Sequence, residues 1–109
     1  MKTSNTVTPD RWLVLKIEDY YKVFATFLGG YTDGDAWKLN SGISSVEQDG
    51  DFYLFHGYSG SIYKCHKSHY GASTWTTGVL EQIMENAKTK NNITVEILDS
   101  NIDFLKIID

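Results

Sequence analysis

Residues 43–67 read ISSVEQDGDFYLFHGYSGSIYKCHK, and this stretch decides the fold. Apolar and polar residues alternate in the runs 43–48, 52–58 and 61–67, which is typical of half-buried β-strands. The Asp-Gly pair in the turn 49–51 favours the positive φ angles that tight hairpin turns require. The stretch therefore predicts a three-stranded antiparallel meander.

The second hairpin sets which side chains share a face. A turn at 58–61 is expected to pair residues whose numbers add up to about 117 or 119. One face would then carry Phe52, Leu54, His56, Tyr63 and Cys65. The other would carry Tyr53, Phe55, Ile62, Lys64 and His66. Cys65 would lie among apolar groups and out of hydrogen-bond reach of His56, so a Cys–His nucleophile is not expected.

The flanking sequence continues the pattern on both sides. Alternation predicts strands at 12–19, 20–31 and 36–40, with the second ending at Gly29 and Gly30 and a hairpin turn at 32–35. After the loop 68–74, apolar residues at helical spacing predict one helix over about 75–89. A strand at 93–98 follows, and residues 103–109 suit a short helix or a last strand.

These elements define an α+β class, in which a mostly antiparallel twisted sheet of about six or seven strands carries one amphipathic helix on a face. Residues 1–10 are expected to be a flexible segment and residues 11–109 a single domain. Asn91 or Asn92 is expected to take the left-handed position that ends the helix.

Composition bounds the function. The chain has 109 residues and a net charge of −4, with one cysteine. It shows neither a secretory leader nor an apolar run long enough to span a membrane, so we expect a cytoplasmic protein without membrane contact. Nucleic-acid binding is not expected, because phosphate contacts need many lysines and arginines. The segment between Asp51 and Glu81 has no carboxylate and carries Lys64 and Lys67 unopposed.

Catalytic and metal-binding patterns are weak. The spacing of Cys65, His66 and His69 superficially resembles that of metal ligands. However, adjacent strand residues point in opposite directions, and no further ligand motif in the sequence completes a set of four. The pairs Asp33–Asp35 and Asp49–Asp51 are explained by turns. No catalytic or cofactor motif occurs, so neither an enzyme nor a cofactor is expected. A hydrolase that uses His66 or His69 as general base is a weaker alternative.

The loop 67–77 is a candidate anion site. It leads from a basic strand end into the helix, whose first N–H groups can bind a phosphate. Its hydroxyl groups include Ser73, Thr74, Thr76 and Thr77, and positive charge would come from Lys64, His66, Lys67 and His69. Tyr58, Tyr70 or Trp75 could stack on a base. This alternative predicts a binder of a small anionic molecule or nucleotide.

Protein recognition is the interpretation that we favour. Tyrosine and tryptophan are common at interface hot spots, and this chain has seven tyrosines and three tryptophans. The residues expected to contact a partner are Tyr58, Tyr63, Lys64, His66, Lys67 and Tyr70. A homodimer through an exposed sheet edge is a further option.

The run WKLNSGI…DFYLFHGYSGSIYKCHK…YG, within residues 36–71, resembles small uncharacterised accessory proteins of tailed bacteriophages. This resemblance implies a protein made in the cytoplasm of an infected bacterium. Short phage proteins of this kind often bind and inhibit a host protein, including proteins of host defence systems. The resemblance carries no catalytic residue over to this sequence.

Overall fold

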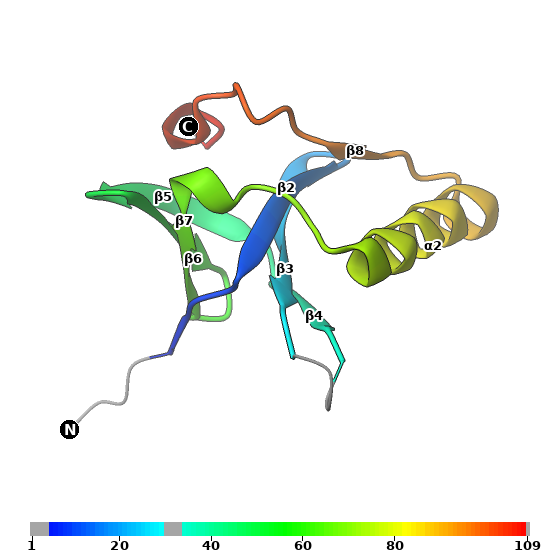
Figure 1. The fold of residues 1–109 in the computed structure, drawn as a ribbon. Coiled ribbons are helices and arrows are strands. Elements are labelled where there is room, and N and C mark those ends of the chain that lie inside the picture. The colour runs from blue at the N-terminus through cyan, green and yellow to red at the C-terminus, as the bar shows by residue number, and fades with distance from the viewer. Residues whose placement is uncertain (1–4, 30–33, 109) are drawn as a thin grey trace.

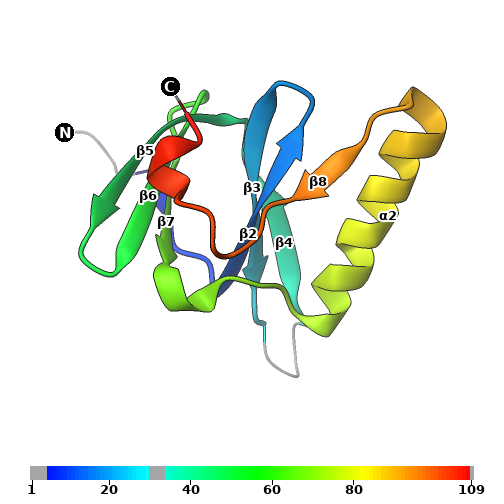
Figure 2. The ribbon, with the colours of Figure 1, turned by 90° about the horizontal axis from the view of Figure 1, so that it is seen from above.

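Two four-stranded sheets and one α-helix form three layers in the computed structural model, which describes residues 5–29 and 34–108 (Figures 1 and 2). The strands are β1 (Thr6–Val7), β2 (Arg11–Ile17), β3 (Tyr20–Phe27), β4 (Ala36–Leu39), β5 (Ile43–Asp49), β6 (Phe52–Gly57), β7 (Ile62–His66) and β8 (Val95–Ile97). The α-helix is α2 (Thr74–Asn91), and two 3₁₀ helices are η1 (Lys67–His69) and η2 (Phe104–Lys106). No helix in these described ranges is long and apolar enough to cross a membrane.

The meander sheet has the strand order β1-β7-β6-β5, and the central sheet has the order β4-β3-β2-β8. Every neighbouring pair is antiparallel except β1 with β7, which is parallel. In Figure 2 the central sheet lies between the meander sheet and α2. The three layers follow from this order.

The central sheet is buried on both faces, and β2 shows why. Trp12 and Val14 belong to the core cluster that contacts the meander sheet. Leu13 and Leu15 alternate with them and belong to the cluster that contacts α2. A strand buried on both sides has an unbroken apolar run, and residues 12–15 form such a run.

Trp12 is the centre of the core between the sheets. Its ring lies 5.4 Å from that of Phe55, 4.7 Å from that of Tyr70 and 5.2 Å from that of Phe104. Its indole Nε1 donates a hydrogen bond of 2.6 Å to the backbone oxygen of His66. The C-terminal η2, seen above the meander sheet in Figure 1, supplies Phe104 to this cluster. Contacts between aromatic rings therefore join the two sheets and the C-terminal segment.

The helix begins with a capping box. The Ser73 side chain accepts from the Thr76 amide, and the Thr76 hydroxyl accepts from the Ser73 amide. The Thr26 hydroxyl donates to Thr76 Oγ1 at 2.9 Å inside the protein, so the cap is also tied to the central sheet. At the other end, Asn92 has a φ of 55° and caps the last turn.

The predicted α+β class and single domain are confirmed, and so is the left-handed Asn92. The strands are divided between two sheets rather than one, since β2 and β3 do not continue the meander. The sequence predicts no strand within residues 1–10, whereas β1 pairs with β7. The expected strand end at Gly30 and the first half of the turn 32–35 lie outside the described residues; Gly34, in that turn, has a φ of 71°.

The predicted hairpin register is wrong by one residue. Phe55 pairs with Tyr63 and Tyr53 with Cys65, so Tyr53, Phe55, Tyr63 and Cys65 share the inner face. The cause is a three-residue loop: the Gly57 amide donates to the Ser61 carbonyl at 2.8 Å, and Gly60 has a φ of 98°. Three-residue loops with a residue at positive φ are a common hairpin type.

Candidate binding surface

The residues that the sequence singles out do not come together in one site. Lys64 and His66 lie on β7, on the side of the meander sheet that faces away from the core. The Lys64 ammonium lies 4.7 Å from the centre of the Phe52 ring, and the His66 ring lies 5.0 Å from it. These two residues are therefore available on a surface.

Lys67 and His69 belong to η1. The His69 ring stacks on His66 at 4.4 Å, and the Ser68 amide donates to His66 Nδ1. The Lys67 ammonium lies 5.2 Å from the centre of the Tyr53 ring. The two histidines thus form a stacked pair at the end of β7.

Tyr63 and Tyr70 are not surface contacts. Tyr63 is 3% exposed and packs in the core between the sheets. The Tyr70 hydroxyl donates to the Leu98 carbonyl at 2.6 Å and accepts from the Val14 amide at 3.1 Å. Burial raises the pKa of both phenols. Their expected role in partner contact is wrong for Tyr63 and does not fit the structural bonds of Tyr70.

The polar groups at the start of the helix are used within the protein. Ser73 and Thr76 bond to each other through the capping box, and the Thr77 amide donates to the Ser73 carbonyl at 2.8 Å. The Gly71 amide donates to the Trp12 carbonyl at 2.8 Å. Thr74 is the first helical residue and is exposed. The anion site expected in this loop would have to compete with these bonds.

Cys65 lies on the inner face of the meander sheet, with no exposed surface. Burial raises the pKa of its thiol strongly. His56 and His66 lie on the outer face of the same sheet, so neither can act on the thiol. Within residues 5–29 and 34–108, no three His, Cys, Asp or Glu side chains come together as a metal site.

Tyr58 is the predicted residue that lies at a hollow in the surface. It is 68% exposed in the β6–β7 loop, and with Tyr20, Lys22 and Ser41 it lines an open depression of about 270 Å³, here called the tyrosine pocket. Tyr20 is 43% exposed at the start of β3. Since Tyr20 and Lys22 are two residues apart on a strand, their side chains project from the same face.

Backbone hydrogen bonds fix the pocket wall. The Tyr58 amide donates to the Gly42 carbonyl at 3.0 Å, and the Ser59 amide donates to Ser41 Oγ at 2.9 Å. The Tyr58 ring packs against Gly42, where a Cβ would lie 2.8 Å from Tyr58 Cδ2. The hairpin loop is thus held on the segment that joins β4 to β5.

Asn40 anchors that segment to β3. Its Oδ1 accepts from the Val23 amide at 2.9 Å and from the Gly42 amide at 3.3 Å, and its backbone N–H donates to the Val23 carbonyl at 3.1 Å. Both backbone groups of Val23 therefore point away from β2. The groups of Tyr21, two residues earlier, point the same way, toward the pocket.

The strand edge beside the pocket is open. β4 pairs with β3 only over residues 24–27, so β3 extends past the end of its neighbour at residues 20–22. Lys22 makes no ion pair within the described part of the chain. The pocket thus combines two exposed phenol rings, an ammonium group with no ion-pair partner among the described residues, a hydroxyl group and a strand edge.

Sequence reasoning missed Tyr20, Lys22 and Ser41. Each lies in a different part of the chain from Tyr58, and the hydrogen bonds from the hairpin loop to residues 41 and 42 bring them together. The one sequence signal that could have pointed to Tyr20 and Lys22 is that the strand they begin is polar at residues 20–22 and apolar after them. Strand order was needed to place it.

Comparisons of the chain with models of protein families, with curated proteins and with solved structures found no match.

Proposed function

We propose that this chain is a non-enzymatic binding protein whose tyrosine pocket holds a side chain of a partner protein. The observation that carries the proposal is the exposure of Tyr58 and Tyr20 around one depression that Lys22 also lines. Tyrosine offers a large contact area and a polar tip with few rotatable bonds, and it is enriched at interface hot spots.

The chemistry of the pocket defines the contact that it would favour. The rings of Tyr20 and Tyr58 suit an apolar or aromatic side chain, and the Lys22 ammonium suits a neighbouring carboxylate. The edge of β3 at residues 20–22 adds backbone groups to which an extended segment could bond. The partner segment is therefore expected to be extended and to place an acidic residue beside an apolar one.

The resemblance to accessory proteins of tailed bacteriophages supports a particular partner class. We propose that the partner is a protein of the infected bacterium and that binding inhibits it, with host defence proteins as the first candidates. A rigid pocket wall supports inhibition by occupation, because a preorganised surface loses little conformational entropy on binding.

The test is affinity capture from a bacterial lysate with four baits: wild type, Tyr58→Ala, Lys22→Glu and Trp75→Ala. Trp75 is 55% exposed on α2 and serves as the matched control for loss of an exposed aromatic ring. We expect one protein to be enriched by wild type and Trp75→Ala and reduced at least about tenfold by Tyr58→Ala and Lys22→Glu. Equal recovery by Tyr58→Ala, or the absence of any enriched protein, would contradict the proposal.

A further inference from the structure

The side of the meander sheet that faces away from the core carries a regular pattern of charge. Strand register places its residues in three rows across β5, β6 and β7. These rows, here called the outer face, are Asp49–Phe52–His66, Glu47–Leu54–Lys64 and Ser45–His56–Ile62. Acidic residues thus lie along β5, apolar residues and a histidine along β6, and basic residues and an isoleucine along β7.

The outer face is not covered within the described part of the protein. Phe52, Leu54 and Ile62 belong to neither core cluster, although each is only partly exposed. In Figure 2 no helix or strand lies over this sheet on the side away from β2 and β3. An apolar strip along one strand, with charged residues along the strands on either side, is typical of an interaction surface.

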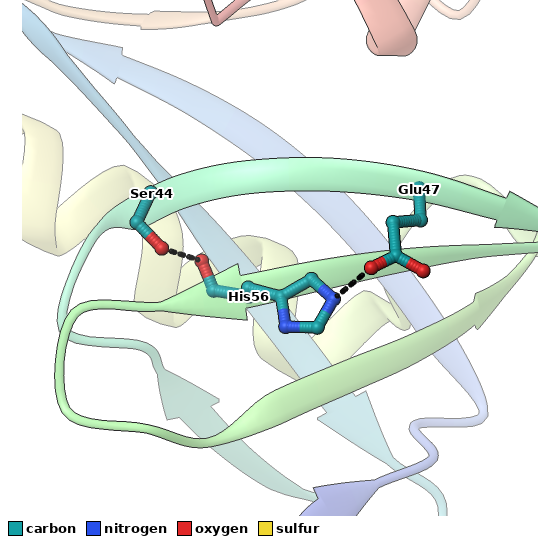
Figure 3. A network of polar contacts seen from close by, with 3 residues as sticks. All are labelled: Ser44, Glu47 and His56. Atoms are coloured by element: carbon teal, nitrogen blue, oxygen red, sulfur yellow. Dashed lines mark hydrogen bonds and ion pairs between the residues drawn. The ribbon is translucent and has the colours of Figure 1, made fainter.

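The charged residues of the outer face can still form ion pairs with a partner. Glu47 Oε2 lies 3.0 Å from His56 Nε2, as Figure 3 shows, yet the Glu47 side chain is still 61% exposed. The Ser44 hydroxyl, also drawn there, bonds to the His56 backbone oxygen at 3.0 Å and braces the same strand pair. Lys64 contacts the Phe52 ring and makes no ion pair within the described residues.

We infer that the outer face binds the outer face of a second copy of this chain. Consider a two-fold axis that runs parallel to β6, in the plane between two copies. Rotation about it keeps each residue at the same position along the strand direction and exchanges the β5 side of the sheet with the β7 side. It therefore places β5 of one copy opposite β7 of the other. Glu47 then faces Lys64 of the second copy, Asp49 faces His66, and Leu54 faces Leu54.

Charge complementarity selects this arrangement. A two-fold axis across the strands would place β5 opposite β5 and β7 opposite β7, so like charges would meet. The axis along β6 pairs opposite charges on both sides of an apolar centre and lets the two sheets pack with nearly aligned strands. A closed two-fold dimer is also the commonest symmetric assembly. This inference does not depend on the tyrosine pocket, which lies at the hairpin loop.

The test is sedimentation equilibrium from low micromolar to several hundred micromolar protein. The proteins compared are wild type, Glu47→Lys, Lys64→Glu and the control Lys38→Glu. The control makes the same charge change as Lys64→Glu, but on the exposed strand β4. We expect wild type and Lys38→Glu to dimerise, and each outer-face variant to dimerise at least about tenfold more weakly, because each places like charges in contact twice per dimer.

A mixture of the two weakened variants gives the decisive result. In a heterodimer of Glu47→Lys with Lys64→Glu, the ammonium group introduced by the first substitution meets the carboxylate introduced by the second. The unchanged Lys64 of the first chain meets the unchanged Glu47 of the other. The mixture should therefore regain dimer affinity within a few-fold of wild type while each variant alone does not. A wild-type chain that stays monomeric, or a dimer that neither reversal weakens, or a mixture that stays monomeric, would overturn the inference.

Discussion

Gly42 is the residue on which the geometry of the tyrosine pocket depends most. Its φ of +129° lies in a region that other residues rarely adopt, and the Tyr58 ring occupies the space that a side chain would need. Any Cβ at this position must displace the ring or the segment beneath it. The glycine therefore links backbone conformation to the position of the exposed tyrosine.

Gly42→Ala should lower the free energy of unfolding by about 1–3 kcal/mol, from backbone strain and the clash with Tyr58. It should also reduce capture of the partner, because Tyr58 must move. Chemical denaturation and the capture assay measure the two effects. Gly50→Ala is the control, since Gly50 has a φ of +60° with open space around it. It should lose stability without losing capture. A Gly42→Ala protein that captures its partner as wild type does would contradict this assignment.

Single residues could be predicted from the sequence where burial alone decided them. Cys65 is buried as expected, although the register used to place it was wrong by one residue. The error exchanged its neighbours: Cys65 lies opposite Tyr53 rather than Phe52 or Leu54. Tyr63 lies on the same inner face as Cys65 and is almost fully buried, so it has little surface to offer a partner. The register error does not explain this miss, because residues 63 and 65 share a face in either register.

At the scale of the elements, local sequence predicted the helix and the strands well. The helix begins at Thr74 and ends at Asn91, within two residues of the expected bounds at each end, because the apolar spacing and Asn92 act locally. The turn between β6 and β7 was predicted at the right place, but the length of its loop was not, because that length depends on one hydrogen bond between Gly57 and Ser61. A one-residue change in a loop moves every side chain of the following strand to the other face.

The capping box of α2 gives a prediction at this scale. Ser73→Ala should lower the free energy of unfolding by about 1 kcal/mol, since the Thr76 amide loses its acceptor. Ser73→Asp should stay close to wild type, because its carboxylate can accept the same bond and suits the positive end of the helix dipole. Denaturant unfolding at neutral pH compares them. An alanine variant as stable as wild type would show that the cap contributes little.

For the whole molecule, the sequence could not reveal that β2 and β3 form a separate central sheet. The pairing of β2 with β8, from the other end of the chain, is a long-range contact that leaves no local pattern. The tyrosine pocket depends on this arrangement, because Tyr20 and Lys22 lie on the central sheet and Tyr58 on the loop of the meander sheet. The outer face, in contrast, lies on three strands that follow one another in sequence, and only its register was missing.

The buried core should make the whole molecule sensitive to alkaline pH. Folding raises the pKa of Cys65 above its ordinary 9.0 and the pKa of Tyr70 above its ordinary 10.0, in both cases mainly through burial. A raised pKa means that the folded protein holds the proton more tightly than the unfolded chain. The resulting stability is complete below the ordinary pKa and is lost as the pH rises toward the folded value.

We therefore expect the free energy of unfolding to be constant near pH 7–8 and to fall above about pH 9, by up to about 1.4 kcal/mol per pH unit for each such group. Urea unfolding at several pH values measures the slope. Cys65→Ala should make the decline of the free energy of unfolding with pH shallower, by the contribution of about one titrating group. A wild-type stability that is equal at neutral and strongly alkaline pH would show that these groups are not buried as described.

The central claim is that a partner protein binds at the tyrosine pocket, and hydrogen–deuterium exchange of the complex with the captured partner tests it most directly. The account predicts that binding slows exchange in residues 20–22, 41–42 and 57–60, which come together only around the pocket. Exchange in α2 should be unchanged. Protection that falls on the loop 67–77 or on α2, with none at residues 57–60, would contradict the claim.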